Sequence, residues 1–149
     1  MREILFRGKS IKTNQWIYGG FHIWEKRQVC ALSNDSLKDD EISYVITVNS
    51  FADWNMPRTM QAVEVIADTV GQYTGLTDRN GRKIFEGDIV NILTENEKFG
   101  IITYDDGGFF VDASTFSVDF MNNINGSDIE VIDNIHDNPK ALKNLNQIK

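Results

Sequence analysis

Short apolar runs, separated by turn residues, recur along the second half of the chain. Each run is rich in β-branched or aromatic residues, so each one predicts a strand. The residues between them favour turns, as in Asp105-Asp106-Gly107-Gly108. Short strands at about ten-residue spacing indicate a small barrel or sandwich. The predicted strands are 88–93, 99–104, 109–113 and 128–132.

The first half of the chain also predicts strands, with less regular turn signals. They are expected at 2–7, 16–24 and 43–48, with one or two extended segments within 62–73. Segment 27–33 is the expected antiparallel partner of 16–24. Gly19 and Gly20 lie inside that strand, which indicates a bulge or a close backbone approach. Polar residues 34–41 predict a turn of helix capped by Asp35 or Ser36.

Residues 49–61 fit no period, although they contain large apolar side chains. Phe51, Trp54 and Met56 are large and apolar, but Asp53, Asn55 and Pro57 interrupt any period. We interpret the segment as an ordered loop whose aromatic residues anchor it to the core. A ligand pocket lined by these side chains is the alternative.

The segment 72–90 carries the strongest local signal. Asn80-Gly81 suits the positive backbone angles of a tight hairpin turn. Asp78 can accept hydrogen bonds from backbone amides two residues further on and so start the turn. Gly87 supplies a second turn. The segment therefore predicts a hairpin that leads into the strand 88–93.

The chain is expected to end in a short helix. Pro139 suits the first helical position, and Asp137 or Asn138 can cap it. Leu142, Leu145 and Ile148 are three residues apart, so they would share an apolar face that packs on the barrel.

The stretch 72–90 closely resembles the signature of the YopX family, small proteins carried mostly by phages and prophages. Segments 1–8, 16–21 and 131–139 are similar to the family in the expected order, so the resemblance spans nearly the whole chain. It implies a mainly β fold with an N-terminal α+β subdomain over 1–75. A C-terminal SH3-like β-barrel with a short terminal helix would follow over 76–149. The resemblance implies no biochemical activity.

Charge is unevenly spread along the 149 residues, whose formal net charge is −7. Residues 1–83 hold 11 Lys and Arg against 10 Asp and Glu, whereas residues 84–149 hold 4 against 12. An acidic half repels phosphate backbones. Nucleic acid is therefore disfavoured as a partner, and only the first half could contact it.

The residue types that carry chemistry are few. Cys30, the one cysteine, excludes an intramolecular disulfide and lies in an apolar run, so we interpret it as a small core residue. His136 and His22 have no Cys or His partners at metal-binding spacing. We therefore expect no metal, no cofactor and no catalytic residue. The N-terminus lacks an apolar leader segment, and no apolar run could span a bilayer, so we expect the cytoplasm of a bacterial host.

Aromatic residues are the best candidates for binding. Trp16, Tyr18, His22 and Trp24 share one parity of a predicted strand, and Tyr73 is a further candidate. An aromatic stripe of this kind belongs either to the core or to an interface. The first hypothesis is therefore a phage or prophage accessory protein that binds a host or phage protein, with homo-oligomer formation left open.

Two alternatives remain. The first is a nucleic-acid-binding protein that uses the N-terminal half. Its contacts would be Arg2, Arg7, Lys9, Lys12, Lys26 and Arg27. The second, which we favour least, is an enzyme, because no catalytic constellation occurs in the sequence.

Overall fold

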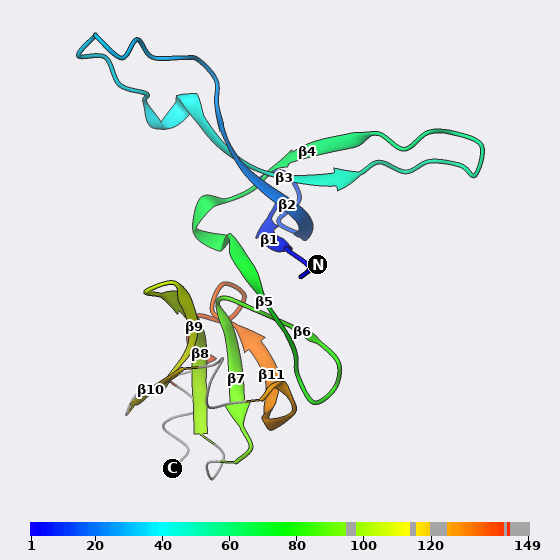
Figure 1. Cartoon of the computed structure of the whole chain (residues 1–149), viewed down its shortest axis with the longest axis vertical. Helices are drawn as coiled ribbons and strands as arrows, with labels where there is room; N and C mark the ends of the chain where they lie inside the picture. Colours follow the sequence, from blue (N-terminus) through cyan, green and yellow to red (C-terminus); the bar gives the residue numbers. More distant parts are fainter. Residues whose placement is uncertain (95–97, 114–115, 120–124, 142, 144–149) are drawn as a thin grey trace. The chain divides into compact units, whose positions relative to one another are not determined.

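The computed structural model describes residues 1–94, 98–113, 116–119, 125–141 and 143 (Figure 1). The chain divides into two compact units. We call Ile4–Val70 the N-terminal unit, and Met1–Glu3 with Gly71–Lys149 the C-terminal unit. Glu3 forms an ion pair with Lys83 at 2.6 Å, which ties the first residues to the C-terminal unit.

The described fold is mainly β, and its helical elements are short 3-10 turns. The N-terminal unit contains β1 (Phe6–Lys9), β2 (Trp16–Glu25), η1 (Asp39–Glu41), β3 (Ile42–Asn49), β4 (Met60–Glu64) and η2 (Ala67–Thr69). The C-terminal unit contains β5 (Gly71–Thr77), β6 (Lys83–Phe85), β7 (Asp88–Ile92), β8 (Lys98–Asp105), β9 (Gly108–Ala113), β10 (Phe116–Asp119), η3 (Gly126–Asp128) and β11 (Ile129–Asn134).

The strands of the N-terminal unit follow the order β4-β3-β2-β1. The end of β4 also returns to the end of β1, where Ser10 bridges to Val65 and the Ile66 N–H donates to the Lys9 carbonyl at 2.9 Å. The sheet therefore curls over its buried side chains, among them Ile46 and Val65. The expected α+β character is wrong, because the only helical pieces of this unit are the 3-10 turns η1 and η2.

The partner of β2 differs from the predicted one. β2 pairs with β3, from Gly20↔Thr47 to Glu25↔Ile42. The predicted strand 27–33 is wrong, since these residues belong to a long connection that extends away from the sheet (Figure 1). Cys30 is exposed in this connection, so its interpretation as a core residue is wrong too.

Gly19 marks the point where β2 stops pairing with β1 and starts pairing with β3. A Cβ atom at Gly19 would overlap the carbonyl oxygen of Thr47, so the predicted close backbone approach is confirmed. At Gly20 a Cβ atom would meet only the Thr47 hydroxyl, at 2.9 Å. A hydroxyl can rotate away, whereas a backbone carbonyl in a ladder cannot.

We therefore expect Gly19→Ala to lower the free energy of unfolding by about 2–3 kcal/mol, because the strands must separate to admit the methyl group. The matched control Gly20→Ala should cost about 1 kcal/mol or less, as most surface changes do. Denaturant titrations of both variants measure the difference. Equal costs would contradict the close approach at Gly19.

The C-terminal unit contains the hairpin β5–β6 and a five-stranded antiparallel sheet in the order β10-β9-β8-β7-β11. Four of these strands match the predicted ones. The described residues form no closed barrel, and the SH3-like barrel stays a prediction. The core lies on one side of the sheet and contains Ile84, Val90, Ile92, Ile102, Phe109, Val111 and Ile129.

The turns of this unit follow the glycine and aspartate signals. Gly81 and Gly87 have φ values of 79° and 84°, and Asp106-Gly107 forms the turn between β8 and β9 with φ values of 45° and 79°. These are left-handed values that glycine and aspartate tolerate best. The expected terminal helix face, Leu142, Leu145 and Ile148, lies outside the described residues.

Candidate interaction surface

The strand register places the aromatic stripe of β2 on one face of the N-terminal sheet. Residues two apart in a strand share a face, and β2 pairs with β1 and then with β3 without a register shift within either ladder. His22 lies opposite Val45, and Tyr18 lies opposite Arg7. Tyr18 is 48% and Trp24 52% exposed, and Trp16 is half-buried. The stripe therefore lies at the surface, although its binding role stays a prediction. We call this side of β1–β4 the aromatic face.

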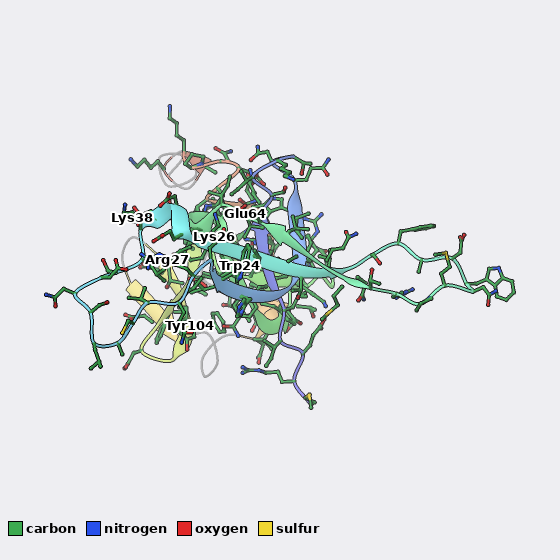
Figure 2. The ribbon with its side chains drawn as sticks, turned by 90° about the horizontal axis from the view of Figure 1, so that it is seen from above. Trp24, Lys26, Arg27, Lys38, Glu64 and Tyr104 are labelled. Atoms are coloured by element: carbon green, nitrogen blue, oxygen red, sulfur yellow. The ribbon has the colours of Figure 1, made fainter. Side chains whose placement is uncertain are left out.

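Two hollows of about 320 and 330 Å³ lie on the aromatic face and share lining residues. Both are lined by Trp24, Val45 and Ala62, and we call them together the Trp24 hollow. Lys12 and Glu64 stand at the wall of the larger one. The Glu64 carboxylate accepts a hydrogen bond from the Ser43 hydroxyl at 2.8 Å, so it is fixed beside the hollow. Figure 2 shows Trp24 and Glu64 on this part of the sheet.

The β3–β4 hairpin continues far beyond the aromatic face (Figures 1 and 2). β2 leaves β3 after Gly20↔Thr47, so the rest of the hairpin is paired only with itself. Ser50 and Thr59 close its outer part through a backbone bond of 2.7 Å and a hydroxyl contact of 2.7 Å. Met56 N–H donates to the Asp53 carbonyl at 2.9 Å and forms the turn at the tip. We call residues 50–59 the finger.

The finger is lined with exposed apolar side chains. Phe51 is 92% and Trp54 97% exposed. Met56 in the tip turn and Met60 at the start of β4 are also exposed. The prediction that these residues anchor the loop to the core is therefore wrong. The polar residues Asp53 and Asn55 and the proline Pro57 interrupt the apolar ones, so the segment has no regular apolar face that could be buried.

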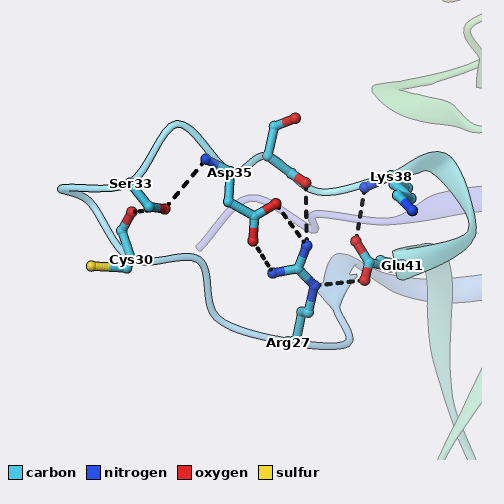
Figure 3. A network of polar contacts seen from close by, with 7 residues as sticks. Arg27, Cys30, Ser33, Asp35, Lys38 and Glu41 are labelled. Atoms are coloured by element: carbon cyan, nitrogen blue, oxygen red, sulfur yellow. Dashed lines mark hydrogen bonds and ion pairs between the residues drawn. The ribbon is translucent and has the colours of Figure 1, made fainter.

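The connection between β2 and β3 is held by Arg27 (Figure 3). Its guanidinium pairs with Asp35 at 2.8 Å and with Glu41, and it also donates to the Ser36 carbonyl at 3.2 Å. The Lys38 N–H donates to the second oxygen of Glu41 at 2.9 Å. These bonds define the loop that replaces the predicted strand.

Hydrogen bonds from Arg27 lower the pKa of both Asp35 and Glu41 below their ordinary values, and the Lys38 N–H adds to the effect at Glu41. Because the pKa values of Asp35 and Glu41 are lower in the folded state than in the unfolded state, the ionised carboxylates stabilise the folded β2–β3 connection. This stabilisation is fully present at a pH above the unfolded-state pKa values. It is lost as the pH falls through the folded ones.

We expect Arg27→Ala to return both carboxyl pKa values toward their ordinary range, because the main donor is removed. Side-chain NMR titration of Asp35 and Glu41 measures the shift. The control is Arg58→Ala, which removes an exposed arginine of the same unit and should leave both titrations unchanged. Unshifted midpoints in Arg27→Ala would contradict the network.

The basic residues named for nucleic-acid contact have diverse surroundings. The Arg7 guanidinium lies 4.7 Å and the Lys9 ammonium 5.5 Å from the Trp16 ring centroid, and Arg7 is only 6% exposed. Lys26 donates to the Asp40 carbonyl at 2.8 Å, and Arg27 is ion-paired. Arg2 belongs to the C-terminal unit, and Lys12 lines the Trp24 hollow. The structure thus gathers only part of this set on the aromatic face.

The remaining candidates are dispersed. Tyr73 is 8% exposed and packs on Phe85 at a centroid distance of 5.6 Å, so it is a core residue and not a surface one. His22 lines the Trp24 hollow, whereas His136 belongs to the C-terminal unit, where its ring lies beside Gly87. Cys30 is in the β2–β3 connection.

Within the described ranges, no group of three or more His, Cys, Asp or Glu side chains could hold a metal ion. Over the same ranges, no helix has the length and apolar character needed to cross a membrane.

Comparisons with protein families and with solved structures both give matches. The model of the YopX protein family matches residues 5–143. The crystal structure of protein EF1440 from Enterococcus faecalis is similar over 95% of this chain and 99% of that chain, with a TM-score of 0.49 and 23% identity. No curated protein matches the chain.

Proposed function

We propose that this chain, which belongs to the YopX protein family, is a non-catalytic phage or prophage accessory protein that acts by binding another protein. The observation that carries the proposal is the finger, which holds Phe51 and Trp54 almost fully exposed. The aromatic face, with Tyr18 and Trp24 half exposed, supports it further.

Large exposed apolar groups on a projecting hairpin are unfavourable in water, and they gain free energy when a partner covers them. Trp, Phe and Met are enriched in protein–protein interfaces, and Trp residues often contribute most of the binding free energy. A surface that gathers these residue types away from the core favours a binding role over a structural one.

The charge balance favours a protein partner over nucleic acid. The finger carries Asp53 and Arg58, so its two charges cancel. Arg7 is buried against Trp16, and Arg27 is neutralised by Asp35 and Glu41. A nucleic-acid surface needs several cations whose counterions can be released.

The test is a pull-down from host lysate with the tagged protein, with and without nuclease, read by mass spectrometry. Wild type is compared with Trp54→Ser and with the matched control Leu32→Ser, which changes another exposed apolar residue of the same unit. The proposal expects a nuclease-resistant protein that is lost only in Trp54→Ser. Recovery that disappears with nuclease would support nucleic acid instead and would contradict the proposal.

A further inference from the structure

The finger and the Trp24 hollow belong to the same unit and to the same two strands. β3 and β4 form the middle of the hollow with Val45 and Ala62, and they continue outward into the finger. A single hairpin therefore carries a projecting apolar tip and an apolar depression. Every copy of the chain therefore carries both a finger and a Trp24 hollow.

We infer that the finger of one copy docks in the Trp24 hollow of a second copy, and that the second copy docks its own finger in return. The inference rests on the proposed function and names its partner: a second copy of this chain. Reciprocal contacts of this kind are isologous, so they close into a two-fold dimer.

The chemistry of the two parts agrees. The finger presents Phe51, Trp54 and Met56, and the hollow is walled by Trp24, Val45 and Ala62. Each part also carries one exposed acid and one exposed base. Asp53 and Arg58 flank the tip, while Lys12 and Glu64 stand beside the hollow. Docking can thus bring each charge of the finger near an opposite charge of the hollow, which fixes the orientation.

The geometry of a hairpin makes the contact reciprocal. The tip lies about seven residues beyond the hollow, or roughly 23 Å at the rise of an extended strand. When two such hairpins lie antiparallel about a two-fold axis halfway along this length, each tip reaches the hollow of the other copy. One relative placement of the two hairpins therefore allows both finger-to-hollow contacts at once.

The area involved suits a stable dimer. Phe51, Trp54 and Met56, with Met60 next to the finger, offer roughly 500 Å² on each copy, since one aromatic side chain buries about 150–250 Å². Two fingers and the two hollows that receive them would bury about 1,500–2,000 Å², which is the range of specific interfaces. One finger contact alone would bury about half of this and fall below that range.

The test is sedimentation equilibrium on the full chain over a wide range of concentrations. The wild type should be a dimer, and Trp54→Ser should raise its dissociation constant about 30-fold or more, as loss of a central Trp does. Ala62→Arg, which fills the hollow from an exposed position, should do the same. Two separate control variants should remain dimeric. Gln61→Arg adds the same charge at the neighbouring exposed position, and Leu32→Ser changes another exposed apolar residue. Thermal unfolding verifies that each variant folds.

Mixing the two defective variants tests the docking itself. Trp54→Ser keeps an intact hollow, and Ala62→Arg keeps an intact finger. A mixed dimer therefore regains one of the two contacts, whereas each variant alone has none. We expect the mixture to associate more tightly than either variant alone, which a purely structural role of Trp54 would not produce.

The outcomes separate this inference from the proposed function. A wild type that stays monomeric up to millimolar concentration overturns the dimer. If Trp54→Ser then loses a host protein in the pull-down, the proposed function stands and only the identity of the partner is wrong. A dimer that survives both substitutions, as pairing through the open edge of β4 would, also overturns the inference.

Discussion

Asp78→Ala is expected to lower the free energy of unfolding by about 3–5 kcal/mol, the largest loss of stability from a single side chain in this account. Asp78 is 4% exposed. Its Oδ1 accepts from the N–H groups of Asn80 and Arg82, both at 2.8 Å, and its Oδ2 accepts from Val131 N–H at 3.1 Å. Alanine would leave these three partly buried backbone donors without their acceptor, and a donor that loses its partner away from water is costly.

Asp78→Asn separates the two parts of this role. Asparagine keeps the oxygen that serves the turn, but it replaces the acceptor for Val131 with an amide donor. We expect Asp78→Asn to lower the free energy of unfolding by about half as much as Asp78→Ala. The negative charge of the acceptor and the hydrogen bond to β11 are lost, but the hydrogen bonds of the turn are kept. Chemical denaturation with both variants measures the two values. A cost of Asp78→Ala below about 1 kcal/mol, the size of an ordinary surface change, would contradict the assignment.

The double substitution Phe51→Ser with Trp54→Ser is expected to abolish partner binding while leaving the fold intact. Both side chains are more than nine-tenths exposed, so their loss should change the free energy of unfolding by only about 0.5 kcal/mol or less. In binding, truncation of two aromatic anchors should weaken affinity by about 100-fold or more, because interface energy concentrates in such residues.

The measurement pairs thermal unfolding with partner recovery for the same protein samples. Leu32→Ser is the control for exposed apolar loss, because Leu32 is 97% exposed in the β2–β3 connection. It should change neither quantity. A clear drop in melting temperature for the double variant would show that the finger packs against the fold, which would contradict its assignment as a binding element.

The parts of the fold that sequence predicts well are those set by local rules. The strands β7, β8, β9 and β11 fall within one or two residues of the predicted ranges, because turn residues such as Gly87 and Gly107 limit them on either side. Asp78 also behaves as its position before Asn80-Gly81 predicts. Its third bond, to Val131, depends on a strand 53 positions away and could not be read from local sequence.

The errors come from contacts between distant residues. Segment 27–33 has an apolar centre typical of a strand, yet the ion pairs of Arg27 with Asp35 and Glu41 hold it in a loop, and β3 takes its place beside β2. Tyr73 looked like a surface aromatic, but its packing on Phe85 depends on the β5–β6 hairpin. The two-residue spacing of the β2 aromatics predicts that they share one face of the strand. Whether that face is exposed depends on how β2 pairs with β1 and β3, which the local sequence does not show.

The finger was the least predictable element, because its exposure depends on where β2 stops pairing. Past Gly20↔Thr47 the hairpin has only its own two strands, so Phe51 and Trp54 find no neighbouring strand to cover them. A sequence shows that such residues are apolar. It does not show that the sheet ends before reaching them.

The most direct measurement is photo-crosslinking in cells from a benzoylphenylalanine placed at position 54, with position 32 as the control. We expect a discrete adduct from position 54 with a protein, and none from position 32. Peptide mapping should place the adduct near Trp24 and Ala62 of a second copy. If position 54 yields no adduct although the protein is expressed and folded, the finger is not a binding element, and the central claim is wrong.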